Sequence, residues 1–190
     1  MEKYLTIFLK SIAVCLTTVM LFSCKNDANK VRDFLKNRNL PIGVAKNAVH
    51  VHKDSGRITS RLVTPLMLDF SNRTTNPYSK FPQGVIITNF SNQKDDSVTI
   101  RGDFAISYSK TKVSEIKGNV VVTNHKEKSQ LKTTQLFWDQ NTKYFFSEKS
   151  FRLTTEKDTI FGEGFESKED LSKHVSKKTT GVLKTIEEVN

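Results

Sequence analysis

A pair of short apolar segments that recurs along the chain is the feature that most constrains its fold. In the first segment, an apolar residue is followed five positions later by a second one, with copies starting at Ile58, Ile100, Leu131 and Ile160. The last three starts lie about 30 residues apart, and a fixed period of that size is typical of structural repeats. A second apolar segment follows within each copy, at 84–87, 118–121, 150–153 and 181–183.

The segments have the composition of short β-strands rather than helices. Thr, Val, Ile and Phe are abundant, and Gly and Asn or Asp residues separate the apolar stretches. No window of 11 residues follows a period of 3.6 cleanly, whereas 98–101, 120–124 and 151–154 alternate between apolar and polar residues. The 190 residues therefore predict a single all-β domain of repeated short antiparallel strands.

The spacing of five within each repeat indicates how the sheet is bent. Side chains alternate between the two faces of a strand, so an odd offset moves a residue to the other face unless a bulge or corner intervenes. We expect a corner in every unit, and hence a rolled, open-ended sheet whose terminal strands have free edges. A plain β-sandwich with chance self-similarity remains an alternative.

The first 24 residues have the pattern of a bacterial lipoprotein signal. The charge-free run 11–22 is shorter than the approximately 20 apolar residues that a membrane-spanning helix needs. Leu21 lies three positions before Cys24 and the small Ser23 directly precedes it, which predicts a lipobox with Cys24 as the acylated residue. An ordinary secretory signal with an incidental Cys is the alternative.

This pattern sets the expected domain organisation and limits the possible function. We expect a signal peptide at 1–23, the acylated Cys24 and a polar tether at 24–47, and the β-domain at 48–190. Cys15 would leave with the signal, so neither a thiol enzyme nor a cysteine zinc site is expected. The net charge of +10 suggests an anionic partner, but an extracytoplasmic location argues against nucleic acid.

Catalytic and metal sites are not indicated. His50 and His52 could share one strand face, but Asp54 is the only carboxylate near them, so we expect no metal. Four carboxylates occupy equivalent places in the repeat, which favours a role in turns over an acid–base pair: Asp103, Asp139, Glu163 and Glu166. No nucleophile elbow or phosphate loop is present, so we predict neither an enzyme nor a cofactor.

Five segments, taken in order with the lipobox ahead of them, resemble a known family: 80–85, 102–108, 117–122, 131–139 and 160–165. Together they are similar to the lipopolysaccharide-export protein family LptC, in the lipoprotein form of Bacteroidetes-type bacteria. The resemblance covers 40–183. Better-known members carry a transmembrane helix as their anchor, and this chain differs from them there.

The resemblance implies a twisted, V-shaped OstA/LptA-like β-jellyroll on the periplasmic face of the inner membrane, with the outer membrane as a possible alternative. Such a protein receives lipopolysaccharide from the inner-membrane ABC transporter and passes it to the periplasmic bridge protein LptA. Three other functions stay open: a free bridge or outer-membrane homologue of the same fold, a carbohydrate-binding surface lipoprotein, and a hydrolase.

An apolar groove for acyl chains is the site that this function would need. The resemblance implies that Phe81 lines it. The alternating strands suggest further lining residues, although core packing is the simpler role for each of them: Ile100, Phe104, Ile106, Val120, Val122, Leu131, Phe151, Leu153 and Ile160.

Free sheet edges would supply the contacts with partner proteins. A last strand at 181–186, with Val182, Leu183 and Ile186, could add to the sheet of the bridge protein, and Val49 and Val51 could face the transporter. Both ends could instead be frayed. A basic run could attract lipid phosphates or simply be solvated: Lys168, Lys173, Lys177 and Lys178.

Overall fold

The computed structural model describes residues 28–37, 39–91 and 96–180. These residues belong to two units, one ending at Arg38 and the other beginning at Asn39. The expected signal peptide, Cys24, and the edge residues Val182, Leu183 and Ile186 lie outside the described residues.

The first unit contributes the helix α2, Ala28–Asn37. Val31, Phe34 and Leu35 follow the i, i+3, i+4 spacing that places side chains on one face of a helix. Among the described residues, no helix has the length and apolar character needed to cross a bilayer.

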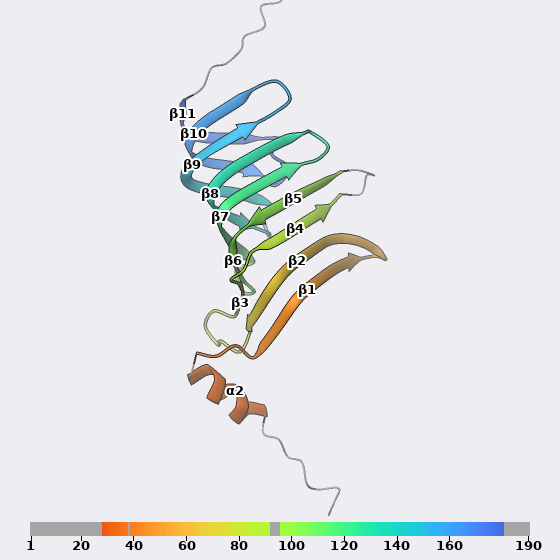
Figure 1. Cartoon of the computed structure of the whole chain (residues 1–190), viewed down its shortest axis with the longest axis vertical. Coiled ribbons are helices and arrows are strands. Elements are labelled where there is room, and N and C mark those ends of the chain that lie inside the picture. The colour runs from red at the N-terminus through yellow and green to blue at the C-terminus, as the bar shows by residue number, and fades with distance from the viewer. Residues whose placement is uncertain (1–27, 38, 92–95, 181–190) are drawn as a thin grey trace, which may run out of the picture. The chain divides into compact units, whose positions relative to one another are not determined.

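The second unit is one antiparallel sheet of short and medium-length strands (Figure 1). The strands run in the spatial order β11-β10-β9-β8-β7-β5-β4-β2-β3-β6, and β1 pairs with β2. Their bounds are β1 Gly43–Asp54, β2 Arg57–Phe70, β3 Tyr78–Phe81, β4 Val85–Phe90, β5 Ser97–Gly102, β6 Phe104–Tyr108, β7 Val113–Asn124, β8 Ser129–Asp139, β9 Tyr144–Thr154, β10 Thr159–Lys168 and β11 His174–Thr180.

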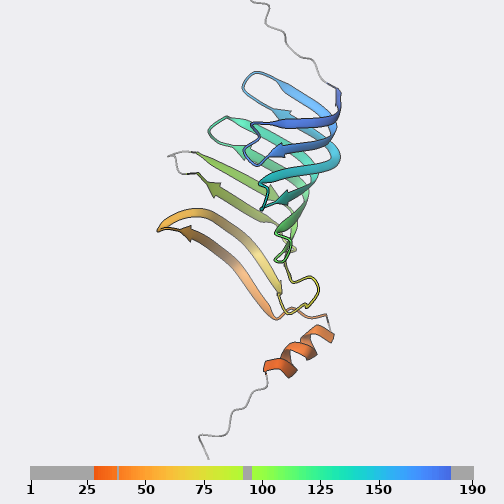
Figure 2. The same ribbon diagram turned by 180° about the vertical axis from the view of Figure 1, so that it is seen from behind.

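Corners divide this sheet into two facing halves. The first half-sheet contains β1, β4 and β5, the second contains β3 and β6, and β7 to β10 continue from one into the other. The β2 strand shows the change of partner, because 60–63 pair with β4 whereas 68–70 pair with β3. Hairpins of the first half-sheet are stacked with their tips on one side (Figures 1 and 2).

The bulges that produce the corners explain the five-residue spacing. Leu131 and Leu136 on β8 are both fully buried, and the pairing of β8 with β9 shifts register between Thr133 and Phe137. The pairing of β10 with β9 shifts in the same way between Glu163 and Phe165. The predicted corners are therefore present, and the all-β jellyroll expected from the sequence is confirmed.

The core lies between the two half-sheets. Its centre consists of side chains with almost no exposed surface, among them Ile100, Ile116, Leu131, Leu136 and Phe145. The β-domain begins within the segment expected to be a tether, because β1 starts at Gly43 and pairs with β2 along most of its length.

Candidate functional site

The interior of the sheet becomes more accessible toward β1. Ile87, an inward residue of β4, is only 8% exposed, whereas Leu62 and Met67 of β2 are partly exposed although both pack against the core. Leu62 lies directly opposite Ile87, so the two side chains share the inner face of the sheet. Leu62 and Met67 are thus partly exposed apolar side chains at the β2 end of the interior, and we call this end the slot.

The face of β1 that continues the slot is uncovered. His50 lies opposite Leu62, and His52 lies opposite Ser60, yet both histidines are exposed. The two imidazoles thus share a face, as expected. Within the described residues, however, no group of three His, Cys, Asp or Glu side chains is placed to hold a metal ion.

A pocket of about 1000 Å³, with polar and apolar lining residues, occupies the open side between the hairpin tips of the two half-sheets, and we call it the mouth. Ser60, the inward position next to Leu62, lines it, so the mouth adjoins the slot. Phe90, Val98 and Trp138 are its apolar lining residues. Its lining includes His52 and the charged residues Asp54, Asp96, Lys126, Glu127, Lys143, Lys168, Glu169 and Asp170.

Two hydrogen bonds close the mouth at the turn between β10 and β11. Asn124 Nδ2 donates to the carbonyl oxygen of Asp170 at 2.7 Å, and Trp138 Nε1 donates to Glu169 Oε2 at 3.3 Å. Asn124 is 2% exposed and Trp138 8%. The half-sheets are therefore joined at β7 and β10, whereas the slot at β2 lies beyond these bonds.

The carboxyl groups of these turns ionise more readily than usual. Burial opposes ionisation of Asp170 most strongly, but hydrogen bonds from Ser172 and the charge of Lys168 outweigh it and lower the pKa. The pKa of Asp139 is lowered chiefly by a hydrogen bond from the backbone N–H of Asn141, at 2.9 Å. Both groups hold turns in place, and Asp139 has the turn role expected from its place in the repeat.

Most of the expected groove residues lie in the closed part of the interior. Seven of them are members of the buried core: Phe81, Ile100, Val120, Val122, Leu131, Phe151 and Leu153. Ile160 is partly buried and packs against that core. The structure thus brings these eight residues together, but it places Leu62 and Met67, which the sequence analysis missed, at the accessible end.

Phe104 and Ile106 require a correction, because they lie on the outer face. Ala105 between them is buried and pairs with Phe81 and Ile116, both of the core. Phe104 instead pairs with the exposed Lys117, and Lys80 Nζ lies 5.5 Å from the centre of its ring. The break at Gly102 and Asp103 between β5 and β6 resets the alternation, so neither side chain can line the interior.

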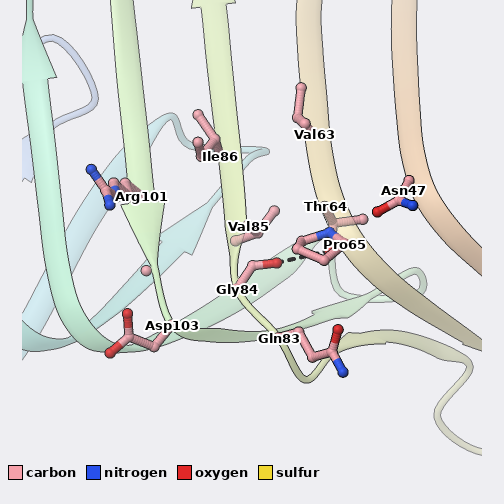
Figure 3. Close-up of a pocket in the computed structure, with 11 residues that line it drawn as sticks. Asn47, Val63, Thr64, Pro65, Gln83, Gly84, Val85, Ile86, Arg101 and Asp103 are labelled. Atoms are coloured by element: carbon pink, nitrogen blue, oxygen red, sulfur yellow. Dashed lines mark hydrogen bonds between the residues drawn. The ribbon is translucent and has the colours of Figure 1, made fainter.

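A second hollow, of about 540 Å³, lies at the corner between the half-sheets (Figure 3). Thr64 Oγ1 donates to the carbonyl oxygen of Gly84 at 2.8 Å, which joins β2 to the turn before β4. Asp103, also in this hollow, accepts a hydrogen bond from Asn119 Nδ2 at 2.6 Å. These bonds stabilise the corner, as expected for a carboxylate with a turn role.

Both ends of the sheet present a strand that pairs on one side. β1 pairs with β2 and carries Val49 and Val51, which are 54% and 39% exposed. β11 pairs with β10 and carries Val175, which is 71% exposed. The basic run of Lys168, Lys173, Lys177 and Lys178 is only partly unpaired, because Lys177 contacts Glu148 at 2.6 Å and Lys178 lies 4.0 Å from Glu163.

Comparison with known proteins gives one match to a family. The family described as "Lipopolysaccharide-assembly, LptC-related" matches residues 12–182, which include the helix and every strand of the sheet. No curated protein matches the chain.

Proposed function

Since the chain belongs to the LptC-related family of lipopolysaccharide-assembly proteins, we propose that it holds lipopolysaccharide by the acyl chains during export. It would receive the lipid from the inner-membrane ABC transporter and pass it to the bridge protein LptA. The observation that carries this proposal is the partly exposed apolar interior at Leu62 and Met67, next to the mouth.

The slot suits acyl chains because Leu62 and Met67 are apolar, partly exposed and packed against the core. Each methylene group removed from water stabilises binding by about 0.8 kcal/mol. Several long chains would then leave too slowly without help. Passage between proteins with similar slots changes the free energy little, so the ATP used by the transporter can drive the lipid in one direction.

The mouth suits the sugar and phosphate part of the same molecule. Lys143 and Lys168 lie among hydroxyl and amide side chains there, and charge-assisted hydrogen bonds to phosphate are stronger than neutral ones. Acidic side chains outnumber lysines in the lining by five to three, and Asp96 lies 3.5 Å from Lys126, so phosphate binding there depends on Lys143 and Lys168. Moderate headgroup binding fits a protein that must release the lipid again.

We propose that each of the two edge strands pairs with a different partner, which would set the direction of transfer. β1 lies beside the slot, so the transporter would add its sheet there, against Val49 and Val51. The bridge protein would extend the sheet beyond β11 by pairing with its free backbone edge or with the segment 181–186 that follows. Cys24 would be acylated and hold the domain at the periplasmic face of the inner membrane.

Binding of lipopolysaccharide to purified variants tests this function. A carboxylate at the inward position in Leu62→Asp should abolish retention of intact lipopolysaccharide, whereas Ile86→Asp on the outer face should retain it. Met67→Gln places an uncharged polar side chain in the same slot, so it should reduce retention less than Leu62→Asp does. Equal binding by all three variants, each shown to be folded by its melting curve, would exclude the slot as the lipid site.

A further inference from the structure

The helix α2 presents apolar side chains to solvent. Val31 is 50% exposed and Phe34 is 54% exposed, although side chains of this kind are usually buried in a folded protein. Leu35, one position further on, is half-buried. Together these residues form a stripe one turn long, and the helix belongs to a different unit from the β-sheet.

Basic side chains border this stripe on both sides. Consecutive residues of an α-helix are about 100° apart, so Lys30 and Arg32 lie to either side of Val31. Asn29 and Asp33 lie on the opposite face. Lys and Arg next to an apolar stripe can bury their methylene groups and keep their charges in contact with lipid phosphates, the arrangement found in helices that lie in a membrane interface.

The length of the helix points to the same environment. α2 has 10 residues, and isolated helices shorter than about 12–15 residues are marginally stable in water. An apolar surface that covers Val31 and Phe34 would stabilise it. Residues 25–38 contain five basic and two acidic side chains, which favours an anionic surface over a neutral one.

We infer that α2 lies in the plane of the membrane, with Val31, Phe34 and Leu35 inserted among the lipids and Lys30 and Arg32 at anionic headgroups. This inference rests on the proposed location of the chain at the inner membrane. The helix then adds a second attachment to an acyl anchor.

Vesicle binding of the chain from residue 24 onward, with Cys24→Ser to remove the acyl anchor, tests the inference. Vesicles of phosphatidylcholine with phosphatidylglycerol should sediment this protein, and pure phosphatidylcholine should sediment it much less. Phe34→Ser should weaken binding to the anionic vesicles at least about tenfold, because a large aromatic side chain no longer leaves water. The double variant Lys30→Gln and Arg32→Gln should lose most of the preference for anionic lipid.

Asn29→Ser is the matched control, because it changes the polar face of the same helix and should leave binding unchanged. Equal binding of Phe34→Ser and Asn29→Ser would overturn the inference. So would a Phe34-dependent association of the protein with itself in the absence of vesicles, which would identify a second copy as the occupant of the stripe. Neither result would affect retention of lipopolysaccharide in the slot, so the two proposals fail independently.

Discussion

Asn124, the last residue of β7, donates a hydrogen bond of 2.7 Å to the carbonyl oxygen of Asp170, in the turn between β10 and β11. The same side chain accepts hydrogen bonds from the backbone N–H groups of Lys126 and Glu127, at 3.0 and 2.9 Å. A single buried amide thus connects the two half-sheets across the mouth and also shapes the turn after β7.

Replacing this amide should open the mouth and destabilise the domain. In Asn124→Ala the carbonyl of Asp170 and two N–H groups lose their partner, so we expect the free energy of unfolding to fall by about 1–3 kcal/mol. Denaturant unfolding measures the change. Asn141→Ala is the control, because its side chain also donates to a backbone carbonyl, that of Thr111 at 3.1 Å, but in an exposed position. A loss no larger than that of the control would contradict the role given to Asn124.

A methyl group at Gly102 should disturb the corner between β5 and β6. An added Cβ would overlap Cγ2 of Ile116, a fully buried residue of the core. Gly102→Ala should therefore lower the free energy of unfolding by about 1–3 kcal/mol. In Gly43→Ala the nearest atom is Cβ of Asp69 at an ordinary 3.5 Å, so its melting temperature should hardly change. Similar melting temperatures for the two variants would show that the corner is not closely packed.

Acid should destabilise the turn between β8 and β9. The pKa of Asp139 is lower in the folded chain than its ordinary value of 3.8, chiefly because the Asn141 N–H stabilises the charged form. The unfolded chain therefore takes up this proton first, and the stabilisation is lost as the pH falls from about 3.8 through the folded pKa. In Asp139→Asn this contribution is absent, so the stability curve should be less steep below pH about 4. Parallel curves for the two proteins would contradict this account.

The bends of the sheet could be predicted because they are encoded locally. Leu131 and Leu136 can both be buried only if a bulge lies between them, and the pattern of apolar residues records that requirement directly. The same rule, applied to Ile100 and Ala105, places Ala105 on the inner face and its neighbours Phe104 and Ile106 outside. The prediction assigned Phe104 and Ile106 to the groove because they are large, although the strand register places them on the outer face.

The accessible end of the interior could not be predicted, because it depends on pairings between distant strands. Leu62 and Met67 lie on either side of Pro65, where β2 changes its partner from β4 to β3. The β3 strand also pairs with β6. No sequence pattern near Leu62 indicates that β2 will pair with this strand. Burial of Phe81 and exposure of Leu62 follow from this arrangement, and not from any difference between the two residues in hydrophobicity.

Photo-crosslinking in cells at two adjacent positions of β2 tests the central claim most directly. A crosslinking side chain at Leu62 faces the slot, whereas one at Val63 faces outward beside Ile86. The lipid-transfer account predicts that Leu62 captures lipopolysaccharide, that capture requires active ATP hydrolysis by the transporter, and that Val63 captures none. Equal capture at both positions, or capture at Leu62 that does not depend on ATP hydrolysis, would contradict it.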